Sequence, residues 1–116
     1  MRRAQRLRHR REFAAVYRRG RPYRSELLAL RVLRTGGPFS RFGFTVGRAL
    51  GKAVTRNRIK RRLREAARSL PVLPGWDLVV NARQGAAEAD YWSLRETLSG
   101  LMARAGLLEQ GEASTK

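Results

Sequence analysis

The first apolar positions of the chain recur at a helical spacing. Phe13, Val16 and Tyr17 lie at i, i+3 and i+4 within residues 8–19, which is typical of a short helix with one apolar face. Gly20 follows at once and is expected to close the helix as its C-cap. Two of the three apolar side chains are aromatic.

Two strands are expected next, over residues 27–33 and 42–47, with a glycine- and proline-rich turn between them. Strict alternation places Phe42, Phe44 and Val46 on one face of the second strand and small residues on the other. A small residue in a strand admits either a packed neighbour or the backbone of a ligand. For any one of these glycines, packing is the favoured interpretation.

A long helix is expected from Ala53 or Thr55 to Leu70, where Pro71 ends it. At 100° per residue one face is apolar and must be the core side: Ile59, Leu63, Ala66 and Leu70. The opposite side carries a polar row, Asn57, Arg61, Arg64 and Arg68, flanked by Arg58 and Lys60.

The last third of the chain predicts a strand over residues 76–82 and a final helix with Asp90 as its N-cap. The apolar stripe of that helix is Leu94, Leu98, Leu101 and Ala105. Trp76 and Trp92 lie in this charge-poor part and are expected to pack in the core or at an edge. The order of helices and strands indicates an α+β or α/β sandwich with one small sheet.

Length and composition bound the organisation of the chain. With 116 residues, no internal repeat and no long linker, one domain over 1–116 is expected, with 109–116 a frayed tail. There is no cysteine and only one histidine, His9, which excludes disulfides, thiol catalysis and Cys-based zinc sites. The chain shows neither a membrane span nor a signal peptide, so a cytoplasmic protein that does not bind membranes is expected.

Charge is the strongest compositional feature and is unevenly distributed. The formal net charge is +17, made of +19 in residues 1–70 and −2 in residues 71–116. Such self-repulsion indicates a polyanionic partner that docks on the N-terminal part. Only 3 of the 26 basic residues are lysine. That ratio suits nucleic-acid binding, but the codon bias of a GC-rich genome explains it at least as well.

Nine basic residues and one acid, Glu65, lie between Arg48 and Arg68. Like charges at i and i+4 destabilise a free helix, and phosphate binding would offset that cost by counterion release. A solvated helix face normally mixes both signs of charge, so a nucleic-acid surface is the better interpretation. No helix-turn-helix, zinc finger or zipper pattern accompanies the helix, and a DNA partner is not expected.

The residues around this helix resemble the bacterial ribonuclease P protein component. The resemblance rests on Phe42-Gly43-Phe44-Thr45-Val46-Gly47-Arg48, Gly51, and Ala53-Val54-Thr55-Arg56-Asn57-Arg58-Ile59-Lys60-Arg61-Arg62-Leu63-Arg64-Glu65. It extends to Glu12-Phe13, Val16-Tyr17 and Gly20 in the first helix and to residues 77–83 in the last strand. Lys52, Ala49 and Arg31 depart from the family pattern, which has Asn, a second basic residue and an aromatic there.

The resemblance implies a two-layer α-β sandwich of order α-β-β-β-α-β-α with a left-handed β-α-β crossover. It implies an accessory subunit of a ribonucleoprotein endoribonuclease that removes the 5′ leader from precursor tRNA. The chemistry would be carried out by Mg²⁺ ions held on the RNA subunit, with no cofactor bound by the protein alone, which is expected to be inactive. The partners implied are the ribonuclease P RNA and the leader.

The residues expected to serve these partners fall into two sets. The RNA-binding set is Arg48, Arg56, Asn57, Arg58, Lys60, Arg61, Arg62, Arg64 and Arg68. The leader-binding set, expected in a cleft between the first helix and the sheet, is Phe13, Tyr17, Arg31 and Phe44. Core packing is an almost equal interpretation for Phe13, whereas the Tyr17 hydroxyl favours an exposed position.

Two other function classes compete with this interpretation. A structural RNA-binding protein of ribosomal type fits the charge and size equally well, and only the extended motif disfavours it. A protein-only nuclease is poorly supported, because two-metal hydrolysis needs converging carboxylates and the first 70 residues hold only Glu12, Glu26 and Glu65. A nuclease with a His9 base would still lack a second histidine as acid.

Overall fold

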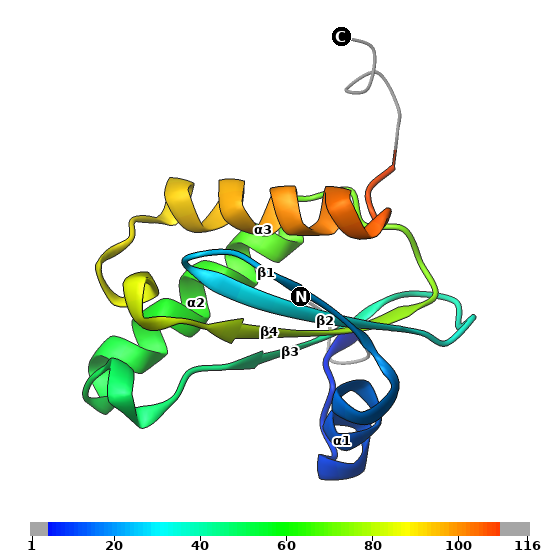
Figure 1. The fold of residues 1–116 in the computed structure, drawn as a ribbon, viewed down its shortest axis with the longest axis horizontal. Helices are drawn as coiled ribbons and strands as arrows, with labels where there is room; N and C mark the ends of the chain where they lie inside the picture. Colours follow the sequence, from blue (N-terminus) through cyan, green and yellow to red (C-terminus); the bar gives the residue numbers. More distant parts are fainter. Residues whose placement is uncertain (1–4, 110–116) are drawn as a thin grey trace, which may run out of the picture.

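A computed structural model describes residues 5–109 as three helices and one four-stranded sheet, with two short 3-10 turns (Figure 1). The expected element order α-β-β-β-α-β-α is confirmed. The elements are α1 (Arg10–Arg19), β1 (Arg21–Arg24), β2 (Leu28–Arg34), β3 (Arg41–Thr45), η2 (Arg48–Leu50), α2 (Ala53–Arg68), β4 (Trp76–Ala82), η3 (Gln84–Glu88) and α3 (Tyr91–Ala105).

The sheet has the order β1-β2-β4-β3, so β1 and β3 are its two edges. β2 runs antiparallel to β1 and β4, whereas β3 and β4 are parallel, with Phe42 opposite Leu78 and Phe44 opposite Val80. Parallel neighbours need a crossover connection, and α2 supplies it. The β-α-β unit that the resemblance implies is therefore present.

The two faces of the sheet are covered unequally. In Figure 1 α3 lies on one side of the sheet and α1 on the other. The face toward α2 and α3 holds the main core, in which Leu30, Ile59, Leu78 and Leu98 are fully buried. A separate cluster of Leu7, Val16 and Val79, with Phe13 and Leu33 partly buried beside it, lies under α1. The two-layer sandwich is thus completed by a short helix on the second face.

The apolar stripes predict the buried faces correctly. All four core-side residues expected on the long helix are buried, as are Leu94, Leu98 and Leu101 of α3. The element ends differ by one to two residues, because α1 begins at Arg10 rather than residue 8 and α2 ends at Arg68 rather than Leu70. Asp90 caps α3, since its Oδ1 accepts from the Ser93 N–H at 2.8 Å.

Gly20 ends α1 for a reason other than a left-handed conformation. Its φ is −80°, an ordinary extended value. A Cβ at this position would lie 2.4 Å from the Val16 carbonyl oxygen and 2.9 Å from that of Val32. Close approach of the backbone of α1 to β2 therefore requires glycine here.

The expectation for the tryptophans is half right. Trp76 is partly buried against the main core, but Trp92 is 70% exposed and makes an edge contact with Tyr91. Trp92 lies at the start of α3, one position after Tyr91, and faces away from the stripe that packs on the sheet. Of the tail expected to fray, residues 110–116 lie outside the described residues.

Candidate nucleic-acid interface

α2 presents its basic residues from a helix that is held by packing rather than by capping. Lys52 at the N-cap makes no side-chain hydrogen bond to the first turn, and that turn has no acidic residue. Ile59 and Leu63 are instead fully buried against the sheet. The remaining circumference of the helix is thus free to carry a dense positive charge without neutralising partners.

Two hollows adjoin along the exposed edge of β3. One is lined by Arg6, Arg61, Arg64, Glu65 and Arg68. The other is lined by Arg6, Leu7, Phe13, Phe42, Gly43, Phe44, Lys60 and Arg64. Because they share Arg6 and Arg64, they form one continuous depression, which we call the β3-edge groove.

The N-terminal segment supplies one wall of this groove. Arg6 pairs with Phe42 in a parallel bridge, and the Leu7 N–H donates to the Phe42 carbonyl oxygen at 2.8 Å. This short pairing adds a strand-like segment to the open edge of β3 and carries Arg6 toward α2. The sequence analysis did not identify Arg6, because a two-residue pairing leaves no periodic signal.

The electrostatic character of the β3-edge groove is strongly positive. Five of its lining residues are Arg or Lys, and Glu65 is the one acid among the described residues that line it. Glu65 lies 3.6 Å from the Arg68 guanidinium, and both side chains are more than half exposed. An exposed pair of this kind contributes little, so most of the positive charge stays available to a polyanion.

The expected RNA-binding set is divided by the body of α2. Arg62 donates to the Ala89 carbonyl oxygen at 2.9 Å, on the flank toward η3 and α3. Arg58 lies one turn earlier on the same flank, and its Nε is buried without a hydrogen-bond partner in the described part of the chain. These two arginines therefore face away from the β3-edge groove, which Lys60 and Arg64 line.

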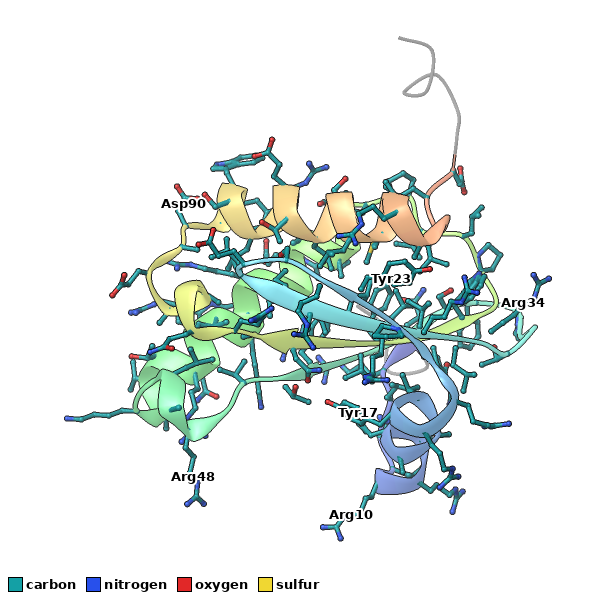
Figure 2. All side chains as sticks on the ribbon, in the orientation of Figure 1. Arg10, Tyr17, Tyr23, Arg34, Arg48 and Asp90 are labelled. Atoms are coloured by element: carbon teal, nitrogen blue, oxygen red, sulfur yellow. The ribbon has the colours of Figure 1, made fainter. Side chains whose placement is uncertain are left out.

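The remaining members of that set gather at the N-terminal end of α2. Arg56 donates from Nε to the Gly51 carbonyl oxygen at 3.1 Å, and Asn57 is exposed. Arg48 lies in η2 and extends from the ribbon into solvent (Figure 2). This end of the helix continues the positive surface of the groove, at the end of α2 opposite Arg68.

On the α1 side of the sheet, Tyr17 and Arg31 make one exposed unit. Tyr17 is 41% exposed, and its hydroxyl donates to Asn81 Oδ1 at 2.7 Å. Arg31 donates to the Tyr17 carbonyl oxygen at 3.2 Å, and its guanidinium carbon lies 5.7 Å from the centre of the Tyr17 ring. The Thr45 hydroxyl also contacts Asn81 Oδ1. An arginine stands here where the family pattern has an aromatic, and it keeps a flat, cationic surface beside Tyr17.

The other two expected cleft residues lie elsewhere. The Phe13 ring covers Gly43 so closely that a Cβ there would lie 2.4 Å from it, which confirms packing as the role of this glycine. Phe44 points to the opposite face, where its ring stacks on Phe42 with centroids 6.0 Å apart, and it packs against the main core. Alternation along β3 causes this, since Phe44 cannot share a face with Gly43 and Thr45.

The four residues therefore do not form a single aromatic cleft. Tyr17 and Arg31 lie together under α1, whereas Phe13 and Phe44 approach the β3-edge groove from its two sides. Asn81, which anchors the Tyr17 hydroxyl, was also missed by the sequence analysis. Asn81 lies within a stretch whose pattern predicts only a strand, and no feature of that pattern distinguishes a polar residue at this position.

An ion-pair cluster fixes α1 on the sheet. Arg41 donates two hydrogen bonds to the buried Asp77 carboxylate, at 2.8 and 2.9 Å, and one to Glu12 at 2.9 Å. Burial raises the pKa of Glu12, but other effects outweigh it and lower that pKa to about 2. They are the hydrogen bonds that the backbone N–H groups of His9 and Arg8 donate to the carboxylate, and the charge of Arg41. The hydrogen bonds that Arg41 donates to the Asp77 carboxylate raise the pKa of Arg41. Both shifts favour the charged forms of Glu12 and Arg41.

These carboxylates do not suit a metal ion. No group of three potential metal ligands is found in residues 5–109, and the two carboxylates that converge share Arg41, whose cation occupies the position between them.

Within the same residues, no helix is long and apolar enough to cross a membrane.

Comparison with known proteins gives consistent results for sequence and fold. The family model described as Ribonuclease P matches residues 1–106. The ribonuclease P protein component of Symbiobacterium thermophilum is 45% identical over 95% of this chain and 98% of its own length. The ribonuclease P protein component of a Roseiflexus species is 40% identical over 97% of this chain and 95% of its own length.

Solved structures extend the similarity to the fold. The RNase P protein of Thermotoga maritima superposes with a TM-score of 0.79 at 35% identity, covering 85% of this chain and 96% of its own. That of Staphylococcus aureus gives a TM-score of 0.81 at 25% identity, covering 90% and 98%.

Proposed function

Because the chain belongs to the ribonuclease P protein family, an accessory subunit of a tRNA-processing endonuclease, we propose that it binds both the catalytic RNA and the 5′ leader of precursor tRNA. By binding both, it would promote removal of the leader to give the mature 5′ end. The family identifies a ribonucleoprotein with an RNA partner, and the division of surfaces between the two RNAs is our proposal.

The β3-edge groove carries this proposal. Its five cations face one exposed acid, and each phosphate that such a surface neutralises releases condensed counterions. We assign the groove, together with Arg48, Arg56 and Asn57 at the start of α2, to the catalytic RNA. Arg58 and Arg62, on the other flank, would reach an RNA that wraps over α2 toward η3.

The surface under α1 is assigned to the leader. A base can stack on Tyr17 while the Arg31 guanidinium meets a neighbouring phosphate, and the Asn81 amide would donate to a base edge or phosphate. Stacking on an aromatic side chain contributes roughly 1–3 kcal/mol per base with little sequence preference, which suits leaders of varied sequence. Phe13 and Phe44 would contact the leader only where it passes over the β3 edge.

The hydrolytic step is assigned to the RNA partner and its Mg²⁺ ions. The two converging carboxylates of the protein are paired with Arg41, so this chain offers the reaction positive charge rather than metal ligands. Positive charge between substrate and ribozyme reduces phosphate repulsion. The protein should therefore lower the Mg²⁺ concentration at which the two RNAs assemble.

Cleavage of 5′-labelled precursor tRNA at low Mg²⁺ tests the proposal. The reaction would use a bacterial ribonuclease P RNA with and without the protein, and the protein alone. We expect rescue of the RNA by the wild type and no cleavage by the protein alone. Arg61→Gln/Arg64→Gln should weaken RNA binding by about tenfold or more at moderate salt, whereas Arg83→Gln/Arg95→Gln removes the same charge and should not.

Three outcomes would count against the proposal. Binding of RNA without rescue of cleavage would favour a structural RNA-binding protein of ribosomal type. Cleavage by the protein alone would overturn the assignment of chemistry to the RNA. Equal losses for the two charge-matched pairs would remove the special role of the β3-edge groove.

A further inference from the structure

A second basic hollow lies at the other edge of the sheet. It is lined by Arg19, Arg21, Tyr23, Val32, Leu33, Arg34, Trp76 and Ala105, and we call it the β1-edge pocket. It forms where α1 ends, β1 begins, β2 meets the first residue of β4, and the C-terminal turn of α3 packs above them. Three of its eight lining residues are arginine, and none is acidic among the described residues.

Both aromatic rings of the β1-edge pocket carry a guanidinium. The Arg34 guanidinium carbon lies 5.8 Å from the centre of the Trp76 ring, and that of Arg104 lies 5.9 Å from the centre of the Tyr23 ring. Arg34 and Trp76 are directly opposite each other in the β2–β4 register, so the sheet itself places this pair. A guanidinium over a ring can itself serve as a further stacking surface.

The β1-edge pocket is separate from both surfaces already assigned. The strand order β1-β2-β4-β3 puts it at the opposite edge from the β3-edge groove. Tyr23 contacts Arg104 of α3, which places it on the other face of the sheet from Tyr17. In Figure 2 Arg34 and Arg48 lie at opposite ends of the molecule. An RNA bound over α2 would not reach this pocket without bending around the sheet, whereas the pocket meets the α1 side of the sheet at Arg19 and Leu33.

The local charge also needs a partner. Residues 18–34 hold six arginines and one acid, Glu26, and this charge belongs to neither the α2 helix nor its motif. Arg19, Arg21 and Arg34 are exposed and make no ion pair in the described part of the chain. Three unpaired cations around a concave site repel one another, and a bound polyanion would relieve that repulsion.

We propose that the β1-edge pocket is a second, independent site for single-stranded RNA. One unpaired base would stack on the Arg34–Trp76 pair, and the flanking phosphates would meet Arg19 and Arg21. A pocket with aromatic rings alone would suit an apolar ligand, and one with cations alone would suit an acidic peptide. This pocket has cation–ring pairs beside free arginines, which match a nucleotide because a nucleotide has both a flat base and a phosphate. The protein would then hold two RNA segments at opposite edges of one sheet.

Trp76 gives the test a direct readout. The chain has two tryptophans, so Trp92→Phe leaves Trp76 as the single one. In that background Arg61→Gln/Arg64→Gln is added to weaken RNA binding at the β3-edge groove. A short single-stranded oligoadenylate is titrated while Trp76 fluorescence is followed. We expect saturable quenching, because a base stacked over the Arg34–Trp76 pair changes the surroundings of the indole.

The pocket variant and its control decide the outcome. Arg21→Gln/Arg34→Gln should lower the affinity by about fivefold or more, because it removes the stacking cation and one phosphate contact. The slope of log K against log salt should become shallower by about 0.7, for the phosphate contact of Arg21. Arg83→Gln/Arg95→Gln removes the same charge outside the pocket, and it should change both the affinity and the salt slope by less than the pocket variant does. Circular dichroism confirms that each variant is folded.

Several results would overturn the proposal. An absence of quenching in the folded single-tryptophan protein would do so, as would equal effects of the two charge-matched pairs. Quenching by polyglutamate as strong as that by the oligonucleotide would assign the pocket to an acidic polypeptide instead. The assay contains no ribonuclease P RNA, so its failure would leave the cleavage test of the proposed function untouched.

Discussion

The two faces of the sheet are built in different ways. The face under α2 and α3 holds nineteen buried residues in one apolar cluster, whereas the face under α1 holds three. The first face can be stabilised by burial of apolar surface alone. The second cannot, and its helix is held by additional polar contacts.

Those polar contacts all reach α1 from distant strands. Glu12 pairs with Arg41 of β3, the Tyr17 hydroxyl bonds Asn81 of β4, and Arg31 of β2 bonds the Tyr17 carbonyl. The Glu12–Arg41 ion pair weakens with salt or with loss of one charge, while apolar burial does not depend on either charge. The comparison indicates a rigid layer of α2 and α3 that displays the basic groove, and a more loosely attached α1 that covers the proposed leader surface.

The largest effect is expected in the apolar layer. Leu98→Ala removes a fully buried side chain from α3 and should lower the free energy of unfolding by about 3 kcal/mol. Val16→Ala on the α1 side is equally buried but lies in a cluster of only three buried residues, so a loss of about 2 kcal/mol or less is expected. Urea denaturation measures both, and a larger loss for Val16→Ala would contradict the comparison.

Arg41→Met tests the ion-pair cluster. It leaves the Asp77 carboxylate, 4% exposed, without its two hydrogen bonds and Glu12 without its cation. An uncompensated buried charge is costly, and the partial exposure of Arg41 reduces the expected loss to about 2 kcal/mol. Adding Asp77→Asn should recover part of that loss in urea denaturation, because it removes the stranded charge. A double variant less stable than Arg41→Met would argue against this account.

The pH dependence of stability should expose Glu12. Its folded pKa of about 2 lies below the ordinary value of 4.5, so the unfolded chain binds the extra proton between these values. The stabilisation is complete above about pH 4.5 and is lost as the pH falls toward 2. Glu12→Gln should cost about 1.5 kcal/mol at neutral pH, and its difference from the wild type should shrink through that window. Glu26→Gln, at an exposed site, is the control and should show no such convergence.

The smallest effect is expected for Tyr17→Phe. It removes one exposed hydrogen bond to Asn81 and keeps the ring, so stability should fall by about 0.5 kcal/mol. Leader affinity should change little, whereas Tyr17→Ala should weaken it by about fivefold or more, because the stacking surface is lost. Binding of a labelled precursor tRNA to the assembled ribonucleoprotein separates the two. Equal losses would mean that the hydroxyl, not the ring, supports the leader.

The apolar periodicity predicted the three helices, the strands β2, β3 and β4, and the buried face of α2, but it did not predict the edge strand β1. The i, i+4 spacing of Ile59 and Leu63 is a local property of the helix, and it holds wherever the helix packs. The basic row opposite them was also foreseen, and helical spacing alone puts Arg62 and Arg64 on different flanks, since residues two apart lie about 200° apart around the axis. What lies beside each flank was not foreseen, namely η3 on one side and the β3 edge on the other.

Long-range pairings set the remainder of the site. Arg6 reaches the groove because the N-terminal segment pairs with β3 at Phe42. Asn81 lies under Tyr17 because the fold brings together two residues that are 64 positions apart in the chain. Phe44 shows the limit of grouping residues by resemblance: alternation along β3 places it on the opposite face from Gly43, whereas the cleft that the resemblance implies groups it with Tyr17.

The sequence by itself determined where positive charge is concentrated, where the three helices and three of the four strands lie, and which family the motif of α2 indicates. These properties depend on neighbours within a few residues, where spacing fixes which side chains share a face. Only the tertiary structure decided that the charge divides into a groove at one sheet edge and a pocket at the other. Sheet order and register bring together groups from distant segments, and no local pattern encodes that order.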